Sequence, residues 1–311
     1  MKRINGGIIG GDNTSTTSVA SGVWSLSEQK KYQSINKWPG KINISEWLIV
    51  AGGGGGGGAE SSINAAGAGG AGGLLTGTDL ILDPGVEYTI VVGAGGAGGL
   101  SSTGTNGGPG ANGVDSSAFG LTAVGGGGGG NWGRAGADGG SGGGGGGRNS
   151  TPGGSGIPGQ GYDGGAAAPG SSAGNDSGGG GGGARQTGKQ AGNSIQGLGG
   201  GGYATYIAGD VSYYADGGMG GTEDGSQRYY IGYQTGGRGG TTSAVASDAL
   251  VNSGSGGGGD GGGGGNGGAG GSGIVIVRTL HTAVATTGTP EIITDGNYNV
   301  YKFTGSGSIT F

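Results

Sequence analysis

The sequence contains no cysteine, which excludes both a disulfide-stapled scaffold and a metal site with thiolate ligands. Long hydrophobic runs are also absent. The longest apolar stretch, "GIVIVRTL" at 273–280, is far shorter than the roughly 18 residues that a membrane-spanning helix needs, so no membrane insertion is expected. The opening stretch "MKRINGGIIGGDNTSTT" is basic but has no continuous apolar segment, so we do not expect a secretory signal there.

Charged residues and prolines are scarce. Only 11% of the residues are charged, whereas soluble domains carry about 25%, and the net charge is −5. This acidic balance without a basic stripe argues against nucleic-acid binding. Glycine provides 99 of the 311 residues, yet there are only 7 prolines and the glycine runs keep no three-residue period. Collagen needs a strict Gly-X-Y period and about 15–20% proline, so it is excluded.

Residues 1–45 differ in composition from the rest and are predicted to form an N-terminal adaptor that anchors the protein. "SLSE" fits a capping box, in which Ser25 caps a helix and Glu28 reaches back to the free amide. A helix over 26–36 should follow and end before Trp38-Pro39-Gly40, because proline disfavours helix at the preceding residue. Its apolar face would carry Trp24, Tyr32 and Ile35.

From Ile42 onward, short β-rich runs alternate with glycine tracts. The strand candidates are Ile42–Ile44, Trp47–Val50, the two sides of Asp83-Pro84-Gly85, 116–124 and 273–280. Turn chemistry at Asp83-Pro84-Gly85 predicts a hairpin over 80–93. The C-terminal residues 281–311 are predicted to join the sheet of the central region, 46–280, as a β-hairpin.

The end of the chain has its own alternating pattern. In "VYKFTGSGSITF", Val300, Lys302 and Thr304 fall on one side, whereas Tyr301 and Phe303 fall on the other. Ile309 and Phe311 would continue the apolar side after the Gly305–Gly307 turn. We therefore predict that 298–311 is an ordered hairpin of the main sheet.

The glycine tracts predict the rest of the fold. They lie at 52–58, 125–130, 142–147, 178–183, 199–202, 256–259 and 261–265. A glycine run in the polyproline-II conformation is a straight rod with about three residues per turn and no internal hydrogen bonds. Its buried amides and carbonyls must be paired, and only glycine lets neighbouring backbones come close enough to pair on every side. Interior rods should need glycine at every position, whereas peripheral rods tolerate another residue at each third one.

The predicted fold class is therefore all-β, with a polyglycine-II helix bundle, a small antiparallel sheet beside the glycine rods and a short N-terminal helix. Two tracts directly follow strands, in "WLIVAGGGGGGG" and "LTAVGGGGGG". This repeated order favours a built structure. The alternative is that the tracts are flexible linkers between small β units.

Four stretches in order, "EWLIVAGGGGGGG", "YTIVVGAGGAGG", "SSAFGLTAVGGGGGG" and "GGSGIVIVRT", resemble the glycine-rich domain of bacteriophage tail fibres, adhesins and other virion surface proteins. The resemblance covers roughly residues 42–280. The opening, with its "GVWSL" element before the glycine-rich part, is similar to structural proteins of marine and cyanobacterial phages. The resemblance implies a polyglycine-II bundle flanked by a small sheet, and a role in host attachment or virion decoration.

The C-terminus departs from this family pattern. "YKFTGSGSITF" resembles a strand pair that commonly precedes such a domain, but here it comes last. Either the C-terminus contributes a strand to the same sheet, or the repeat is interrupted.

Residues suited to catalysis or to metal binding are few. "GARQTGK" (183–189) has Walker-like spacing, but Gln190 stands where Ser or Thr must meet magnesium. The single histidine, His281, has no Ser or Asp pattern around it, and Glu223-Asp224 is expected to be a solvated pair. Asp260 fits a calcium repeat poorly and is expected to face outward from a glycine rod. The sequence therefore predicts no enzyme, no cofactor and no metal.

Tyrosines are the best candidates for a binding site. The segment 203–233 carries Tyr203, Tyr206, Tyr213, Tyr214, Tyr229, Tyr230 and Tyr233, mixed with glycine, serine and aspartate. This mixture is typical of adaptable binding loops. Trp132 is expected at the same end of the rods. The alternative is that these rings form a small satellite core or a subunit contact.

Together these features favour a non-enzymatic bacteriophage virion protein, a tail fibre or adhesin subunit assembled in the host cytoplasm. Residues 1–45 would bind other virion proteins, and the tyrosine loops would contact a host surface glycan or protein. A capsid decoration protein without a receptor site is the first alternative, and an ice-binding protein is the second. A homotrimer stays open, because phage fibres are usually trimers although the rods need no partner chain.

Overall fold

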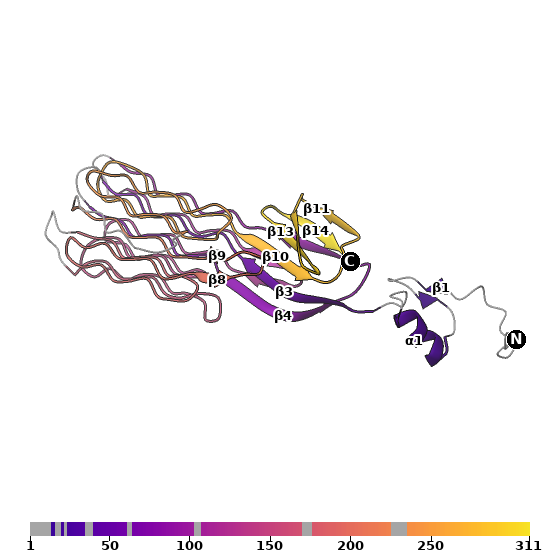
Figure 1. Ribbon diagram of the computed structural model, residues 1–311. Helices are drawn as coiled ribbons and strands as arrows, with labels where there is room; N and C mark the ends of the chain where they lie inside the picture. The colour runs from indigo at the N-terminus through magenta and orange to yellow at the C-terminus, as the bar shows by residue number, and fades with distance from the viewer. Residues whose placement is uncertain are drawn as a thin grey trace, which may run out of the picture.

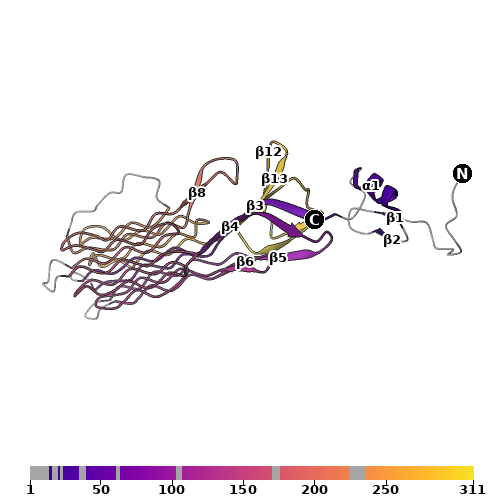
Figure 2. The ribbon, with the colours of Figure 1, turned by 90° about the horizontal axis from the view of Figure 1, so that it is seen from below.

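The computed structural model describes residues 14–15, 20–21, 24–34, 40–60, 64–102, 107–169, 176–224 and 235–311. In these residues the protein is all-β apart from one helix, α1 (Leu26–Ser34). Figures 1 and 2 show α1 beside the short paired strands β1 (Thr14–Ser15) and β2 (Ala20–Ser21). Figure 1 shows the main sheets next, and then a long bundle of extended segments. The N-terminal elements and the bundle therefore lie on opposite sides of the sheets.

Helix α1 begins as its sequence predicts. The Ser25 N–H donates to Glu28 Oε2 at 2.9 Å, and the Glu28 N–H donates to Ser25 Oγ at 3.3 Å, which is a capping box. The rings of Trp24 and Tyr32 meet edge to face with centroids 5.0 Å apart, as expected for one shared face. Ile35 and the expected extension of the helix to residue 36 lie outside the described residues.

The first sheet is antiparallel. It contains the strands at the two ends of the region 42–280, β3 (Ile42–Val50) and β10 (Ile274–Thr279). Its order is β12 (Glu291–Asp295), β13 (Tyr298–Phe303), β10, β3 and β4 (Leu74–Leu82). The candidates Ile42–Ile44 and Trp47–Val50 form one strand, β3. The predicted boundary between the N-terminal adaptor, 1–45, and the central region, 46–280, therefore falls inside this strand. A bulge at Ser45 breaks the pairing with β10, because Glu46 pairs with Arg278 whereas Ile44 pairs with Thr279.

The second sheet packs its strands in the order β11 (Ala285–Thr287), β14 (Gly307–Thr310), β5 (Glu87–Val91), β6 (Ser116–Ala118) and β7 (Leu121–Ala123). The candidate strand 116–124 is in fact the β6–β7 hairpin. Its turn residues Phe119 and Gly120 have φ values of 55° and 77°, as a two-residue hairpin turn with the right twist requires.

The two hairpins predicted over 80–93 and 298–311 are wrong in the same way. β4 pairs with β3 in the first sheet, whereas β5 pairs with β14 and β6 in the second. Likewise β13 belongs to the first sheet and β14 to the second. Each tight connection crosses from one sheet to the other, because both flanking strands bury side chains in the core between the sheets. The hairpin that 281–311 does contain is β12–β13.

The alternation predicted for the C-terminal strands is confirmed. Tyr301, Phe303, Ile309 and Phe311 all lie in one buried core, to which the first sheet contributes Ile49 among others. Val300, on the opposite side of β13, lies in a second core with Leu48, Val50, Ile274 and Ile276. Strand β3 therefore contributes side chains to both cores, because successive side chains of a strand point to opposite faces.

Glycine-rich segments continue the strands as straight rods. β3 runs directly into Ala51–Ala59, and β7 runs into 124–131, so the repeated strand-then-glycine order is one continuous path in each case. Other rods lead into β4 and β10. Figures 1 and 2 show these rods running side by side away from the sheets. We call the end where rods meet strands the sheet end, and the opposite end the far end.

Hydrogen bonds from the rod Ala51–Ala59 show the polyglycine-II arrangement. The amides of Gly52, Gly53 and Gly54 donate to three different rods, at Val114 O (3.0 Å), Gly271 O (2.9 Å) and Gly70 O (2.8 Å). The next three amides repeat this pattern on the same rods, at Ala111 O, Gly268 O and Gly67 O. This three-residue period is that of a polyproline-II helix.

The carbonyls of the same rod accept from three further rods. Gly126 N–H donates to Gly52 O, Gly96 N–H to Gly53 O and Gly257 N–H to Gly54 O. Rods therefore surround Ala51–Ala59 on every side, and its buried backbone groups are paired without any side chain. The linker alternative is wrong for this tract, since a flexible linker would leave these groups to water.

Peripheral rods show the third-position rule. In the rod 93–100, Gly93, Gly96 and Gly99 are buried, whereas Ala94, Ala97 and Leu100 are exposed. One tract departs from the prediction, since 261–265 is not a rod. Gly262 and Gly264 have φ values of 84° and 75°, and they form the turn that leads to the next rod. Gly261 and Gly262 are still buried, but Gly263 and Gly264 are exposed, so no neighbouring rod holds the chain extended there.

Candidate functional site

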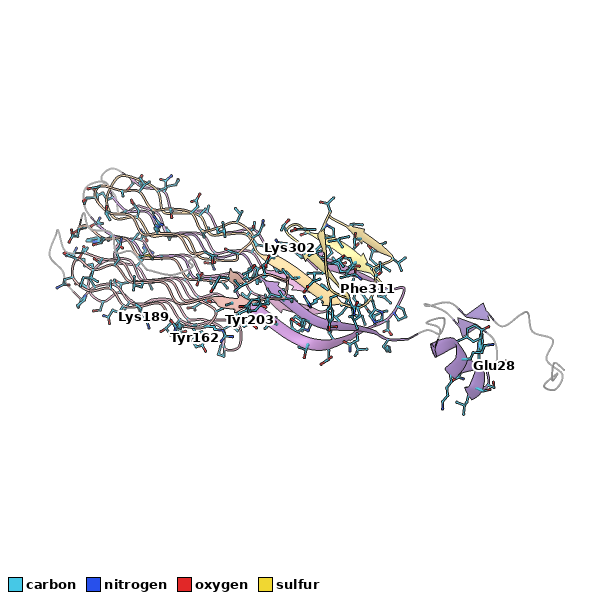
Figure 3. All side chains as sticks on the ribbon, viewed as in Figure 1. Glu28, Tyr162, Lys189, Tyr203, Lys302 and Phe311 are labelled. Carbon is cyan, nitrogen blue, oxygen red and sulfur yellow. The ribbon has the colours of Figure 1, made fainter. Side chains whose placement is uncertain are left out.

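The predicted tyrosine site lies at the sheet end. Tyr203 and Tyr214 sit on a two-stranded hairpin, β8 (Tyr203–Thr205) and β9 (Ser212–Tyr214), and Figure 3 places Tyr203 at the junction of rods and sheets. Tyr214 is only 5% exposed and belongs to the second core. Tyr203 is partly buried, and the Arg185 guanidinium lies 4.7 Å from its ring centroid.

The other predicted tyrosines do not complete one surface. Tyr213 is partly buried, whereas Tyr206 is 70% exposed in the turn of the hairpin. Tyr229, Tyr230 and Tyr233 lie outside the described residues. The described tyrosines thus divide between core packing and surface, and the satellite-core alternative applies to Tyr214.

Arg278 of β10 connects this hairpin to the first sheet. Its Nη1 donates to Asp295 Oδ2 at 2.6 Å and to the Ile207 carbonyl at 3.5 Å, and its guanidinium lies 4.3 Å from the ring centroid of Tyr298. Because Arg278 is largely buried and bonded to both units, the hairpin packs against the sheet as part of the scaffold.

Trp132 lies at the far end, so the expectation that it shares an end with the tyrosines is wrong. It follows the rod that starts at β7, and the length of that rod separates it from the sheets. The Trp132 indole N–H donates to Asp176 Oδ2 at 2.9 Å, and the Arg148 guanidinium lies 4.6 Å from the Trp132 ring. This stack fixes the turn after one rod to the turn after another.

Beneath Trp132 lie two buried carboxylates, Asp176 and Glu223, which are 4% and 9% exposed. Glu223 accepts from the amides of Asn64 at 2.6 Å and Asp176 at 3.1 Å, so the expected solvated pair at Glu223-Asp224 is wrong for Glu223. Its carboxylate replaces the rod carbonyls that these amides lack at the far end. Burial raises the pKa of Asp176, the hydrogen bond from Trp132 lowers it, and repulsion from Glu223 raises it further.

Asp260 is also buried, with no exposed surface, although an outward-facing position was expected. Its Oδ1 accepts from the Gly261 amide at 2.9 Å, and its Oδ2 accepts from the Ala59 amide at 3.4 Å. These amides stand where the rods end, so the carboxylate takes the place of a missing neighbour. Burial raises the pKa of Asp260, while hydrogen bonds from Gly261, Ala59 and Gly262 oppose that rise.

Sequence reasoning missed this capping role, which recurs along the bundle edge. Asp115 Oδ1 accepts from the Gly125 amide, and Asn112 Oδ1 accepts from the Gly128 amide, both at 2.8 Å. Asn112 and Asp115 are three residues apart, as are the amides that they bond, which matches the rod period. A pair of Asp or Asn residues three positions apart inside a glycine-rich segment is therefore the sequence signal that would have identified Asn112 and Asp115 as capping residues.

The family follows from this architecture together with the sequence. A family model described as a glycine-rich domain matches residues 27–280, from helix α1 through the whole bundle to the end of β10. The chain belongs to this glycine-rich domain family. Among curated proteins, none matches the chain. The domain includes six strands of the two main sheets, β3 to β7 and β10, whereas β11 to β14 follow its end.

The segment "GARQTGK" and His281, for which the sequence predicts no chemical role, make structural contacts. Within "GARQTGK", the Gly183 amide donates to the Gln186 carbonyl, which makes this segment a tight turn between rods. The His281 carbonyl accepts from Asn299 Nδ2 at 3.3 Å in the turn after β10. In the described part of the chain, no group of three or more His, Cys, Asp or Glu side chains is placed to hold a metal. No helix there has the length and apolar character to cross a membrane.

The pKa of Asp260 leads to a prediction on stability. Because its pKa is higher in the folded state than in the unfolded chain, the folded state binds the proton more tightly. This contribution to stability is fully present below the unfolded pKa of about 3.9 and is lost as pH rises through the raised folded pKa. As pH rises, the melting temperature of the unsubstituted protein should therefore fall relative to that of Asp260→Asn, whose side chain does not titrate. A difference that is constant from acid to neutral pH would contradict this.

Proposed function

We propose that this glycine-rich domain protein is a non-enzymatic structural protein of a bacteriophage virion, a tail fibre or adhesin subunit that presents its far end to the host. The observation that carries the proposal is the two-ended architecture. The N-terminal elements lie beyond the sheets, and the rods extend from the other side of the sheets (Figure 1). Residues 1–45 would attach to other virion proteins, and the bundle would act as a rigid mount for the far-end turns.

The composition of the far-end turns supports contact with a host surface. Their exposed residues are mostly small and polar, with Ile195 and Val245 as apolar exceptions, and include Asn149, Ser150, Asn193, Thr242, Ser243 and Asn266. Side chains of this kind supply adaptable hydrogen bonds in binding loops. Beneath them, the Trp132–Asp176 hydrogen bond and the capping carboxylates hold the turns in place, which is the usual division between rigid scaffold and variable loop. We therefore move the proposed receptor contact from the tyrosines to the far end.

Charge substitutions at the two ends test this proposal. Thr242→Lys with Ser243→Lys alters the far end, whereas Thr294→Lys with Thr304→Lys places the same charges on the sheets, and all four side chains are exposed. We expect adsorption of the protein to host cells to fall by about tenfold or more with the far-end pair, as the loss of about 1.4 kcal/mol would cause. The sheet pair should leave adsorption unchanged.

Equal adsorption by both pairs would overturn the far-end contact. Immunogold imaging of virions tests the broader proposal. Label at the tail supports a fibre or adhesin subunit, whereas label spread over the head would instead make the protein a capsid decoration protein.

A further inference from the structure

A concave pocket opens on the flank of the bundle, near the sheet end and apart from the far-end turns. Its volume is about 480 Å³, and Gly156, Pro158, Gly159, Gly161, Tyr162, Asp163 and Ala184 line it. Pockets for small ligands are commonly about 300–1,000 Å³. Figure 3 shows Tyr162 on this flank, with Tyr203 closer to the sheets. We propose that this pocket binds a neutral saccharide, with one pyranose ring stacked on Tyr162.

The backbone of Tyr162 is fixed in the bundle, whereas its side chain is partly exposed to solvent. Its carbonyl accepts from the Gly142 amide at 3.0 Å, which fixes the backbone in the bundle. The side chain is 47% exposed, and its hydroxyl makes no hydrogen bond in the described part of the chain. A large aromatic ring in this position contributes nothing to either core. Such a ring offers a flat apolar face to the C–H groups of a sugar at little entropic cost.

Asp163 supplies an oriented acceptor beside that ring. Its Oδ1 accepts from the Gly156 amide at 2.8 Å, and its own carbonyl accepts from Gly188 at 2.9 Å. No ion pair in the described part of the chain involves this carboxylate, so Oδ2 can accept from a sugar hydroxyl. One oxygen thus sets the orientation of the carboxylate while the other stays available to a ligand.

Backbone groups of the lining residues supply donors. In the described part of the chain, the amides of Gly159, Tyr162 and Asp163 donate to no protein atom. Sugar hydroxyls both donate and accept, so they match a pocket that offers a carboxylate and free amides together. A cationic ligand would use the carboxylate and the face of Tyr162, but not the free amides. Because three lining residues are glycines, a ring can also approach the peptide planes closely.

Saturation-transfer NMR on the full chain tests the pocket. The probes are the methyl glycosides of glucose, galactose, mannose and N-acetylglucosamine, with tetramethylammonium as a cationic probe. We expect transfer to at least one glycoside, at dissociation constants in the millimolar range. Tyr162→Ala should weaken that binding by about tenfold, since aromatic anchors dominate small sites. Asp163→Asn should weaken it while keeping an oxygen for the Gly156 amide, and Tyr162→Phe should preserve it.

Leu250→Ala is the control, because Leu250 is 59% exposed and does not line the pocket. Its binding should equal that of the unsubstituted chain, and melting curves should show that every variant folds. The proposal is overturned if no glycoside shows transfer, if only tetramethylammonium does, or if Tyr162→Ala binds as well as Leu250→Ala. The inference does not rest on the far-end contact. Loss of glycoside binding with intact host adsorption, or the reverse, separates the failure of one proposal from the failure of the other.

Discussion

Gly55→Ala should lower the free energy of unfolding by about 3 kcal/mol, the upper part of the range for an overpacked core. A Cβ at this position would lie 2.1 Å from the Ala97 carbonyl oxygen and 2.5 Å from its carbon. Both atoms are backbone, so no side chain can rotate away, and the rods themselves must separate. Separating the rods 51–59 and 93–100 would lengthen the hydrogen bonds between them, Gly96 N–H to Gly53 O and Gly99 N–H to Gly56 O. Chemical denaturation or melting curves measure the loss.

Gly305→Ala is the matched control for this substitution. Gly305 lies in the connection between β13 and β14, where an added Cβ would meet no atom within 4 Å. It should change the stability by less than about 0.5 kcal/mol. If Gly55→Ala were as well tolerated as Gly305→Ala, the rods could not be in backbone contact, and the bundle arrangement would be wrong.

Tyr214→Ala should also destabilise the protein, by about 3 kcal/mol, since removing a buried aromatic ring leaves a cavity. The ring packs in the second core with Ile274 and Ile276 of β10 and with Ile207 of its own hairpin. The loss should appear as a lower melting temperature with unchanged host-cell adsorption in the fraction that remains folded.

Tyr206→Ala, in the same hairpin, provides the comparison. Its side chain is 70% exposed, so the melting temperature should hardly change. A stable Tyr214→Ala variant that fails to adsorb to host cells would reverse our reading and restore the tyrosine hairpin as the receptor contact.

Local sequence signals gave reliable predictions where a few neighbouring residues decide the structure. The capping box at Ser25 and Glu28 forms as predicted, because both partners lie within one helical turn. The alternation from Val300 to Phe303 places side chains correctly in two cores, because the two-residue period of a strand is a local property.

Pairing between distant segments was not predictable in the same way. Turn chemistry at Asp83-Pro84-Gly85 indicates a reversal of the chain but not which sheet the next strand joins. Here β5 joins the second sheet because Ile90 and Leu82 both become buried between the sheets. Two separate sheets, with a core between them, exist only once 285–310 has returned to pair with β5 and β10.

The candidate site shows the same limit. Tyr203–Tyr214 and Trp132 looked alike in sequence, as aromatics beside glycine tracts, but they lie at opposite ends of the rods. Which end a turn occupies depends on the number of rods that precede it, and the tract 261–265 shows that a glycine run need not be a rod. Asp260 and Glu223 looked solvated, yet they are buried, because rod ends leave amides that need an acceptor.

The sequence by itself determined that the backbone, and not side chains, would form most of the core. With 99 glycines among 311 residues and few apolar side chains, the chain has too few side chains to fill a large core, so its buried peptide groups must pair with one another. Only the tertiary structure decided which rods are neighbours, which carboxylates replace missing rods and which turns share an end. The physical reason is that glycine rods are nearly identical to one another, so local sequence carries little information about partners. Which rods become neighbours is decided instead by the few side chains in strands, in turns and at the bundle edge. These side chains make their contacts only when distant segments of the chain come together.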